Sequence, residues 1–218
     1  MSIFGVLKKC FKFVFFLFLR FFSIKATTKK NLIIFGLPSS GKTSIIYFFK
    51  LGYLITTVRT FLINEESFTI TLKTNKDNFE EKKFKVKFFE IGSDCSFNLI
   101  KEYSELSNDL IYIVDSSQKG SLSEARDDFI RIIYDFRFIY RKCKFLIFLN
   151  KQDSNGCLKS DEIINYFSLP KELLYRCKFI SCSTLSGEGL KEGLEWLLNS
   201  NVFSDRNDVN YENRKIYY

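Results

Sequence analysis

The sequence predicts an α/β fold of three layers, in which a mostly parallel sheet is covered by helices on both faces. Short apolar runs of the strand type alternate along the chain with longer runs of helical period, an order typical of parallel sheets. The first strand and the first helix are joined by a glycine-containing loop at residues 36–43. The chain has 218 residues, which is enough for one such domain with extensions at its ends.

The basic charge of the chain is concentrated in its first 30 residues. This arm carries seven basic side chains and no acidic one, whereas the rest of the chain contributes only +1 to the total of +8. A nearly neutral body argues against a nucleic-acid partner, and a basic arm favours an anionic partner such as a membrane surface. Wound as a helix, residues 3–24 place Lys8, Lys9, Lys12 and Arg20 on one side and an almost wholly apolar face on the other.

The pattern of residues 3–24 predicts an amphipathic helix that lies in a membrane interface. The longest uncharged run, Phe13–Leu19, is too short to span a bilayer, which needs about 20 residues. Three alternatives remain open: a helix packed on the domain's own surface, a short membrane-spanning signal anchor, and a cleaved secretory signal near Ala26. Ser2 excludes the N-myristoylation pattern.

The loop after the first strand, Leu32–Phe35, reads G-x-x-x-x-G-K-T. A strand before it and a helix after it form the context that a phosphate-binding P-loop requires. Its glycines let backbone N–H groups surround a phosphate, and the helix N-terminus adds positive potential. Lys42 would supply charge to the β- and γ-phosphates, and Thr43 a hydroxyl to Mg²⁺. The predicted nucleotide-binding residues here are Gly36, Leu37, Pro38, Ser39, Ser40, Gly41, Lys42, Thr43 and Ser44.

Further strands and helices follow in alternation. Residues 51–66 show no clear period and are predicted to be a loop. Alternating apolar residues then predict two half-buried strands that form a hairpin with a long charged tip at residues 74–83. Strands are expected at 68–72, 84–88, 110–115, 145–149 and 178–182, and helices at 97–106, 122–138, 161–167 and 190–198.

Three segments result: the arm at residues 1–30, one folded domain at 31–198, and a polar tail at 199–218 that is predicted to be disordered. The six cysteines include no C-x-x-C pair, which favours a reduced, cytosol-facing domain. The chain has no histidine, and this excludes histidine-based metal sites and the Ser-His-Asp and Cys-His arrangements of nucleophilic catalysis.

A second motif follows the strand at 145–149 directly. Asn150-Lys151-Gln152-Asp153 reads N-K-x-D. The carboxylate of Asp153 can accept two hydrogen bonds from guanine N1–H and N2–H₂, a donor pair that adenine lacks. Asn150 can bond the purine edge, and the stem of Lys151 can lie along the base. With a P-loop upstream, the motif predicts a site for a guanine nucleotide.

These motifs and the sequence around them resemble the Arf/Arf-like (ADP-ribosylation factor) family of small GTPases over residues 31–198. The shared segments are Lys50-Leu51-Gly52, Val114-Asp115-Ser116, Glu124-Ala125-Arg126, Asn150-Lys151-Gln152-Asp153, Ser186-Gly187-Glu188-Gly189-Leu190 and Glu192-Gly193-Leu194-Glu195-Trp196-Leu197. The resemblance implies a P-loop NTPase fold with a six-stranded sheet, GTP or GDP with Mg²⁺, and a role in membrane traffic. It also implies that the backbone amides of Ser183 and Thr184 contact the guanine oxygen.

The resemblance assigns a further Mg²⁺ ligand in switch I, the segment after the first helix. The family's threonine matches Thr60, because the sequence from Lys50 onward aligns without a gap. Thr57 is the alternative. Arg59 stands where the family has proline, and Leu62 where it has glycine.

Switch II departs from the family, whose pattern D-V-G-G-Q appears as E-I-G-S-D at residues 90–94. Glu90 keeps a carboxylate for the outer shell of Mg²⁺. Ser93 keeps the N–H that meets the γ-phosphate but has less φ freedom than glycine. Asp94 replaces the glutamine that orients the attacking water, and an ionised carboxylate only accepts hydrogen bonds and adds negative charge beside phosphate. Because Asp94 occupies the catalytic position, the sequence predicts that GTP hydrolysis is slow or absent.

The sequence as a whole indicates a membrane-associated guanine-nucleotide-binding protein. By resemblance, it would regulate vesicle or protein trafficking on the cytoplasmic face of an intracellular membrane, Golgi or another endomembrane, with an exchange factor, a GTPase-activating protein and effectors as partners. Two alternatives stay open: a pseudo-GTPase scaffold that does not switch, and an anchor like the β subunit of the signal-recognition-particle receptor. The short, charged apolar run and the family-like sequence after Asp115 argue against the second.

Overall fold

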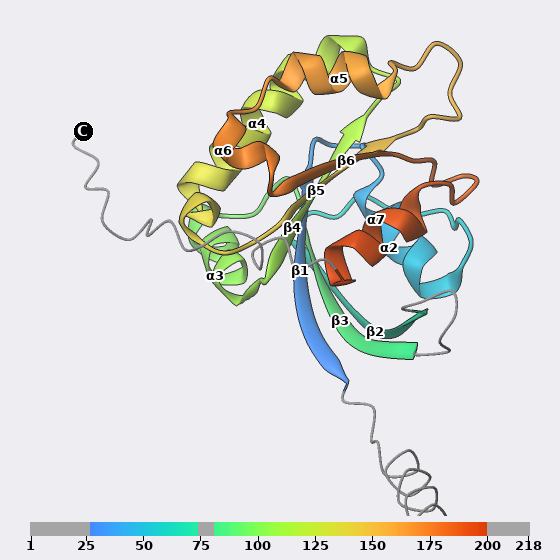
Figure 1. Ribbon diagram of the computed structural model, residues 1–218, viewed down its shortest axis with the longest axis vertical. Coiled ribbons are helices and arrows are strands. Elements are labelled where there is room, and N and C mark those ends of the chain that lie inside the picture. The colour runs from blue at the N-terminus through green and yellow to red at the C-terminus, as the bar shows by residue number, and fades with distance from the viewer. Residues whose placement is uncertain (1–26, 74–80, 200–218) are drawn as a thin grey trace, which may run out of the picture.

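One sheet organises the part of the chain that the structure, a computed structural model, describes: residues 27–73 and 81–199 (Figure 1). The six strands of this part are, in chain order, β1 (Thr28–Gly36), β2 (Ile63–Lys73), β3 (Glu81–Ile91), β4 (Asp109–Asp115), β5 (Phe145–Asn150) and β6 (Cys177–Ser181). In space the order is β2-β3-β1-β4-β5-β6, and only β2 and β3 pair antiparallel. The predicted six-stranded, mostly parallel sheet is confirmed.

Helices cover both faces of this sheet (Figure 1). They are α2 (Lys42–Leu51), α3 (Phe97–Leu106), α4 (Leu122–Asp135), α5 (Ser160–Phe167), α6 (Lys171–Leu174) and α7 (Leu190–Asn199), with short 3-10 turns η1 (Lys119–Ser121) and η2 (Phe138–Tyr140). Apolar side chains of α2 and α7 pack on one face, and those of α3, α4 and α5 pack on the other. The predicted three-layer arrangement is therefore present.

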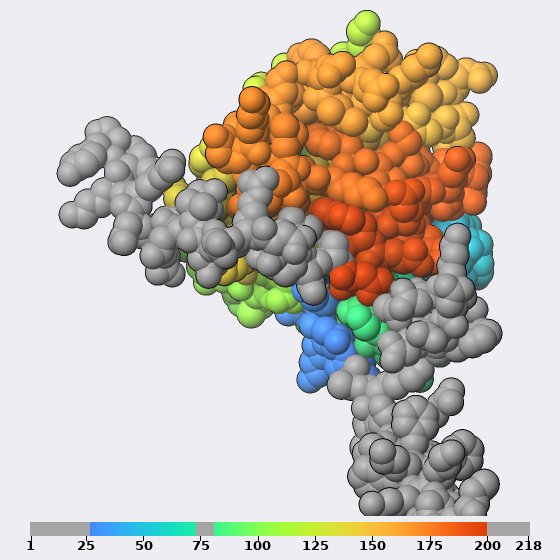
Figure 2. All heavy atoms as spheres, in the orientation of Figure 1, coloured from blue at the N-terminus to red at the C-terminus, as the bar shows by residue number. Residues whose placement is uncertain are grey.

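Each face of the sheet has its own apolar core, because successive residues of a strand point to opposite sides. In β1, Ile33 and Phe35 pack with α4, whereas Leu32 and Ile34 pack with α2 and α7. Strands β4 and β5 are buried along their whole length, as central parallel strands are. The space-filling view shows the segments from α5 to α7 spread over one side of the molecule (Figure 2).

The strand order places the loops after β1, β3 and β5 at one edge of the sheet. β1 lies between β3 and β4, so the chain reaches β3 on one side of β1 and then crosses to β4 on the other. Ligands of open α/β sheets bind outside the carboxyl ends of the strands at such a switch point. The P-loop follows β1 at this place, and the N-K-x-D motif begins with the last residue of β5, which is separated from β1 by β4.

Besides β3, which starts at Glu81 inside the predicted hairpin tip 74–83 and pairs there with Lys73 of β2, two strands begin earlier than predicted. β1 starts at Thr28, before the predicted domain start at residue 31, because Thr28 pairs with Phe84 of the long strand β3. β2 starts at Ile63, inside the predicted loop 51–66, and pairs with β3 from that residue onward. Backbone pairing with a partner distant in sequence extends both strands into segments whose side chains show no strand period.

The helix predicted at 122–138 ends at Asp135. The chain turns out of helical geometry at Arg137, whose φ is 57°, a left-handed value that a helix does not continue through. The short helix α6 was not predicted, because four residues are too few to show a period.

Several predictions lie outside the described residues. They concern the amphipathic helix at residues 3–24, residues 74–80 of the hairpin tip, and residues 200–218 of the tail. Within 27–73 and 81–199, no helix has the length and apolar character needed to cross a membrane.

Candidate nucleotide-binding site

The P-loop joins the end of β1 to the start of α2 and depends on two glycines for its path. Gly36 and Gly41 have φ values of 145° and 101°, which favour glycine. A Cβ atom on Gly36 would lie 2.5 Å from the carbonyl oxygen of Ile113, and one on Gly41 would lie 2.3 Å from Nδ2 of Asn150. The loop is therefore pressed against the ends of β4 and β5, with no room for side chains at these two positions.

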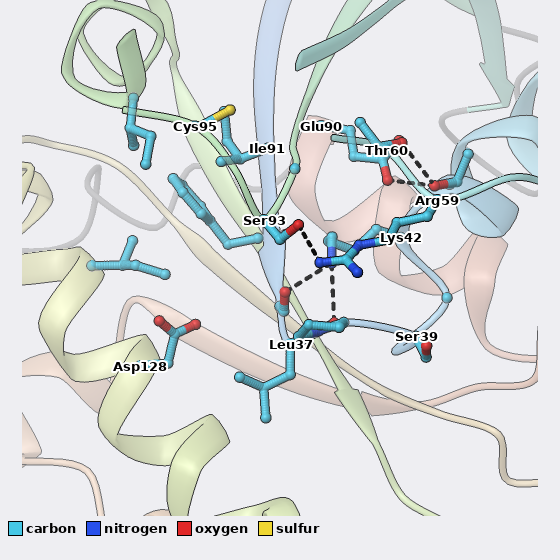
Figure 3. Close-up of a pocket in the computed structure, with 18 of the residues that line it drawn as sticks. Leu37, Ser39, Lys42, Arg59, Thr60, Glu90, Ile91, Ser93, Cys95 and Asp128 are labelled. Atoms are coloured by element: carbon cyan, nitrogen blue, oxygen red, sulfur yellow. Dashed lines mark hydrogen bonds between the residues drawn. The ribbon is translucent and has the colours of Figure 1, made fainter. Parts of the chain in front are cut away.

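The P-loop borders a cavity of about 700 Å³ (Figure 3). Three segments from different parts of the sequence line it: the P-loop itself, residues 57–60 after α2, and residues 90–93 at the end of β3. Side chains of α3 and α4 close its far end. Of the predicted residues, those that line the cavity are Gly36, Leu37, Pro38, Ser39, Gly41, Lys42, Thr43, Ser44, Thr60, Glu90 and Ser93.

Lys42 reaches into this cavity from the first turn of α2. Its ammonium donates hydrogen bonds to the carbonyl oxygens of Gly36 at 2.8 Å and Leu37 at 3.0 Å. Burial lowers the pKa of Lys42, Glu90 acts in the opposite direction, and the positive charge of Arg59 lowers it further. A desolvated cation of this kind is stabilised by an anionic ligand, which compensates for the water that it has lost.

A group of oxygen atoms lies beside Lys42. The hydroxyls of Thr43 and Thr60 are 3.3 Å apart. Thr43 also donates a hydrogen bond to the buried carboxylate of Glu90. The second oxygen of Glu90 accepts a hydrogen bond of 3.0 Å from Nδ2 of Asn64. Switch I is thus folded onto the P-loop, with Thr60 next to Thr43.

These oxygen atoms fit Mg²⁺, which takes hydroxyl, carboxylate and water oxygens. Thr43 and Thr60 would hold the ion through their hydroxyls, and Glu90 would hold it in its outer shell. The ion would neutralise charge on the phosphates. Thr57, the alternative to Thr60, has its hydroxyl 3.4 Å from that of Ser44.

Switch I and switch II are joined by backbone hydrogen bonds. The N–H of Gly92 donates to the carbonyl of Leu62 at 2.6 Å, and that of Asp94 donates to Phe61 at 2.9 Å. A Cβ atom on Gly92 would lie 2.4 Å from the carbonyl oxygen of Phe61. Glycine at this position therefore permits the close approach of the two segments.

Asp94 does not line the cavity, in contrast to its neighbour Ser93. Asp94 is exposed, and its carboxylate accepts a hydrogen bond of 2.9 Å from the hydroxyl of Ser93. That hydroxyl accepts a hydrogen bond of 2.6 Å from Nη2 of Arg59. The residue that replaces the family's glutamine thus lies behind Ser93, and the cation Arg59 is closer to the cavity.

Asn150 connects the P-loop with the loop after β6. Its Nδ2 donates to the carbonyl of Ser40 at 2.9 Å. Its Oδ1 accepts hydrogen bonds from the backbone N–H and the hydroxyl of Thr184, at 3.2 and 2.8 Å. Asn150 is only 1% exposed, and a buried amide with its donor and acceptor paired holds its neighbours in one arrangement.

The other residues of the second motif are also held by partners. Lys151 forms an ion pair of 2.6 Å with Asp115. Burial alone would raise the pKa of Asp115, but hydrogen bonds from Lys151 and Ser117 outweigh it and leave this pKa lowered. Asp153 is exposed and accepts a hydrogen bond from the hydroxyl of Ser183, which ties it to the loop after β6 that is expected to contact guanine, called the guanine loop below.

Two residues make contacts at the site that the sequence analysis does not predict. Asn64 lies opposite Glu90 because the β2–β3 register pairs these residues, and that register is not visible in the sequence. Arg59 stands where the family has proline. Its position directly before the expected Mg²⁺ ligand Thr60 was the available signal that this cation lines the cavity.

Comparisons with known proteins agree with this geometry. The sequence matches a model of the ADP-ribosylation factor family over residues 18–201, which is most of the chain. Among solved structures it is similar to the small GTPase Arl6 (BBS3) of Trypanosoma brucei, determined with the nucleotide analogue GppNp bound. The two share 25% sequence identity with a TM-score of 0.61, over 78% of this chain and 95% of that chain. The chain therefore belongs to the ADP-ribosylation factor family of small GTPases.

Proposed function

We propose that this protein binds GTP and GDP, together with Mg²⁺, in the cavity beside the P-loop. The observation that carries the proposal is the position of Asn150, which bonds both Ser40 of the P-loop and Thr184 of the guanine loop. This contact supports a single site, because it joins the P-loop, which lines the cavity, to the N-K-x-D motif and the loop after β6, which are not among the lining residues. The GppNp bound to the similar Arl6 structure supports the proposal.

Each end of this site has a defined task. Lys42 and the amides of the P-loop bind the phosphates, with Thr43 and Thr60 at Mg²⁺. Asp153 selects guanine, because its carboxylate accepts from N1–H and N2–H₂ and finds no such donors on adenine. The ion pair with Asp115 holds Lys151 in place beside the base.

We propose further that GTP hydrolysis by the chain alone is slow or absent. Hydrolysis requires a group that orients the attacking water, and a glutamine amide does this by both donating and accepting. Asp94 only accepts when ionised, and it lies outside the cavity wall, bonded to Ser93.

The proposed setting is the cytoplasmic face of an intracellular membrane, where the protein regulates vesicle or protein trafficking. Its basic arm would bind anionic lipids, with residues 3–24 as an interfacial helix. Exchange factors, GTPase-activating proteins and effectors are the partners that this role implies. Family membership and the charge of the arm support this part of the proposal.

The nucleotide claim is tested by competition binding with the purified full-length chain. Fluorescent GDP is displaced by unlabelled GDP, GTP, ADP or ATP, with and without Mg²⁺. We expect guanine nucleotides to compete at least 100-fold better than adenine nucleotides, as in sites built to bond a donor pair. Equal competition by ADP and ATP would refute the proposal. Bound nucleotide that never exchanges would favour the pseudo-GTPase scaffold.

The membrane claim is tested with vesicles of neutral lipid and vesicles that contain phosphatidylserine. An interfacial arm predicts sedimentation with the anionic vesicles and release at high salt, because the attraction is screened. Membrane retention through alkaline carbonate extraction would instead support a spanning anchor, like that of the signal-recognition-particle receptor β subunit. A variant with Lys8, Lys9 and Lys12 changed to Gln serves as the matched control for the charge.

A further inference from the structure

Arg59 projects into the phosphate end of the cavity. It lines the cavity together with Lys42 and Ser93, and Figure 3 shows its guanidinium group between Ser93 and the P-loop. Its positive charge is close enough to depress the pKa of Lys42. Lys42 and Arg59 thus reach the same cavity from different segments, and the cavity is lined in addition by the acidic side chains of Glu90 and Asp128 and by Arg131.

The partners of Arg59 do not compensate for its charge. Nη2 donates a hydrogen bond of 2.6 Å to the neutral hydroxyl of Ser93, and the guanidinium carbon lies 5.7 Å from the centre of the Phe61 ring. Within residues 27–73 and 81–199 its guanidinium forms no ion pair with a carboxylate. A guanidinium fork that faces a cavity without an acidic partner is suited to a phosphate, which it binds through two parallel hydrogen bonds.

The location identifies which phosphate would be bound. Arg59 directly precedes Thr60, whose hydroxyl lies at the expected Mg²⁺ position beside Thr43. It contacts Ser93, whose N–H is the one expected to meet the γ-phosphate. Lys42 lies between these groups and the start of the P-loop, where it is bonded to Gly36 and Leu37. The terminal phosphate is therefore the one that comes within reach of Arg59.

We propose that Arg59 binds the γ-phosphate of GTP and makes the site prefer the triphosphate over the diphosphate. This inference rests on the proposed guanine-nucleotide binding and adds a residue to it. The guanidinium exchanges the Ser93 hydroxyl for a phosphate oxygen, so a hydrogen bond to an anion replaces one to a neutral hydroxyl.

A purely structural role for Arg59 is the competing explanation. The side chain would then serve as a clasp between the switches through Ser93. The backbone already supplies such a clasp, since Gly92 bonds Leu62 and Asp94 bonds Phe61. A clasp holds the site equally for both nucleotides, whereas a γ-phosphate ligand acts on GTP alone. The two roles therefore differ in which nucleotide loses affinity when Arg59 is removed.

The experiment measures dissociation constants of the full-length chain for GDP and for the non-hydrolysable GppNp, both with Mg²⁺. Arg59→Ala is expected to weaken GppNp by roughly 10- to 100-fold, the value of a hydrogen bond to a charged group, and to leave GDP within about twofold. Arg59→Lys should recover part of the loss, because it restores the charge without the fork. Lys171→Ala, which removes an exposed charge from α6, is the control and should change neither constant.

The outcomes separate this proposal from the one on which it rests. Equal weakening of GDP and GppNp by Arg59→Ala, or no weakening of either, would overturn the γ-phosphate role while guanine-nucleotide binding stands. A wild-type chain that binds no guanine nucleotide would overturn both. Retained GDP affinity in Arg59→Ala also shows that the variant is folded.

Discussion

The two ends of the candidate site are built in different ways. At the base end, Asn150 and Thr184 are buried, and their polar atoms are paired with one another and with the P-loop. At the other end, where the switches meet, Arg59, Ser93 and Asp94 are exposed, and their side chains form a short chain of hydrogen bonds. The first arrangement suits constant recognition of one base. The second costs little to rearrange, because water can replace each of its bonds.

The largest difference between the two ends should appear in stability. Asn150→Ala leaves the carbonyl of Ser40 and the hydroxyl of Thr184 unpaired inside the protein and should lower the free energy of unfolding by about 3 kcal/mol. Ser93→Ala, at the exposed end, should change it by no more than about 0.5 kcal/mol. Urea unfolding in the absence of nucleotide measures both changes in free energy, on the condition that the m-value is the same in the variants and the wild type. Similar losses of stability in the two variants would show that the two ends of the site do not differ in this way.

The next largest effect concerns base selection. Asp153→Asn replaces a pure acceptor by an amide that also donates, so it should weaken GTP by about 100-fold. It should strengthen binding of xanthosine triphosphate, which carries a carbonyl oxygen where guanine carries its amino group. Competition against fluorescent GDP and its xanthosine counterpart measures this exchange. Unchanged preference would mean that Asp153 does not contact the base.

At the other end, Asp94→Gln restores the amide of the family pattern. We expect single-turnover GTP hydrolysis to rise by about tenfold or more, because Gln can orient a water that Asp cannot. The affinity for GDP should stay the same, since Asp94 lies outside the cavity. Asp94→Asn also removes the charge, but its side chain is one methylene shorter than that of Gln. Comparing the two variants therefore separates the effect of charge from the effect of side-chain length. A wild-type rate already equal to that of Asp94→Gln would contradict the proposed defect.

The smallest effect is the pH dependence of the ion pair between Asp115 and Lys151. The pKa of Asp115 is lowered in the folded state, so its contribution to stability is present above its unfolded pKa and is lost as the pH falls through the folded value. The loss should therefore begin below about pH 4 and stay under about 1 kcal/mol, because Lys151 is partly exposed to water. Acid unfolding of Lys151→Met should show a weaker dependence in this range.

Elements whose boundaries are set by local chemistry were predicted well. The helix at 97–106 begins and ends where the sequence indicated, and its start is capped by the side chain of Ser96, which accepts from the N–H of Leu99 at 3.4 Å. The start of β2 at Ile63 was missed, because it depends on pairing with Ile91. Nearby residues specify a cap, whereas a strand boundary depends on a partner that the local sequence does not contain.

The sequence by itself determined the α/β class, the P-loop with Lys42 and Thr43, and the N-K-x-D motif, because each is written in consecutive residues or in a simple period. Only the tertiary structure placed Asn64 beside Glu90, turned Asp94 toward Ser93, and brought Arg59 next to the P-loop. Such contacts join segments that are distant in the chain. They follow from the register of β2 on β3 and from the approach of two loops, which packing decides.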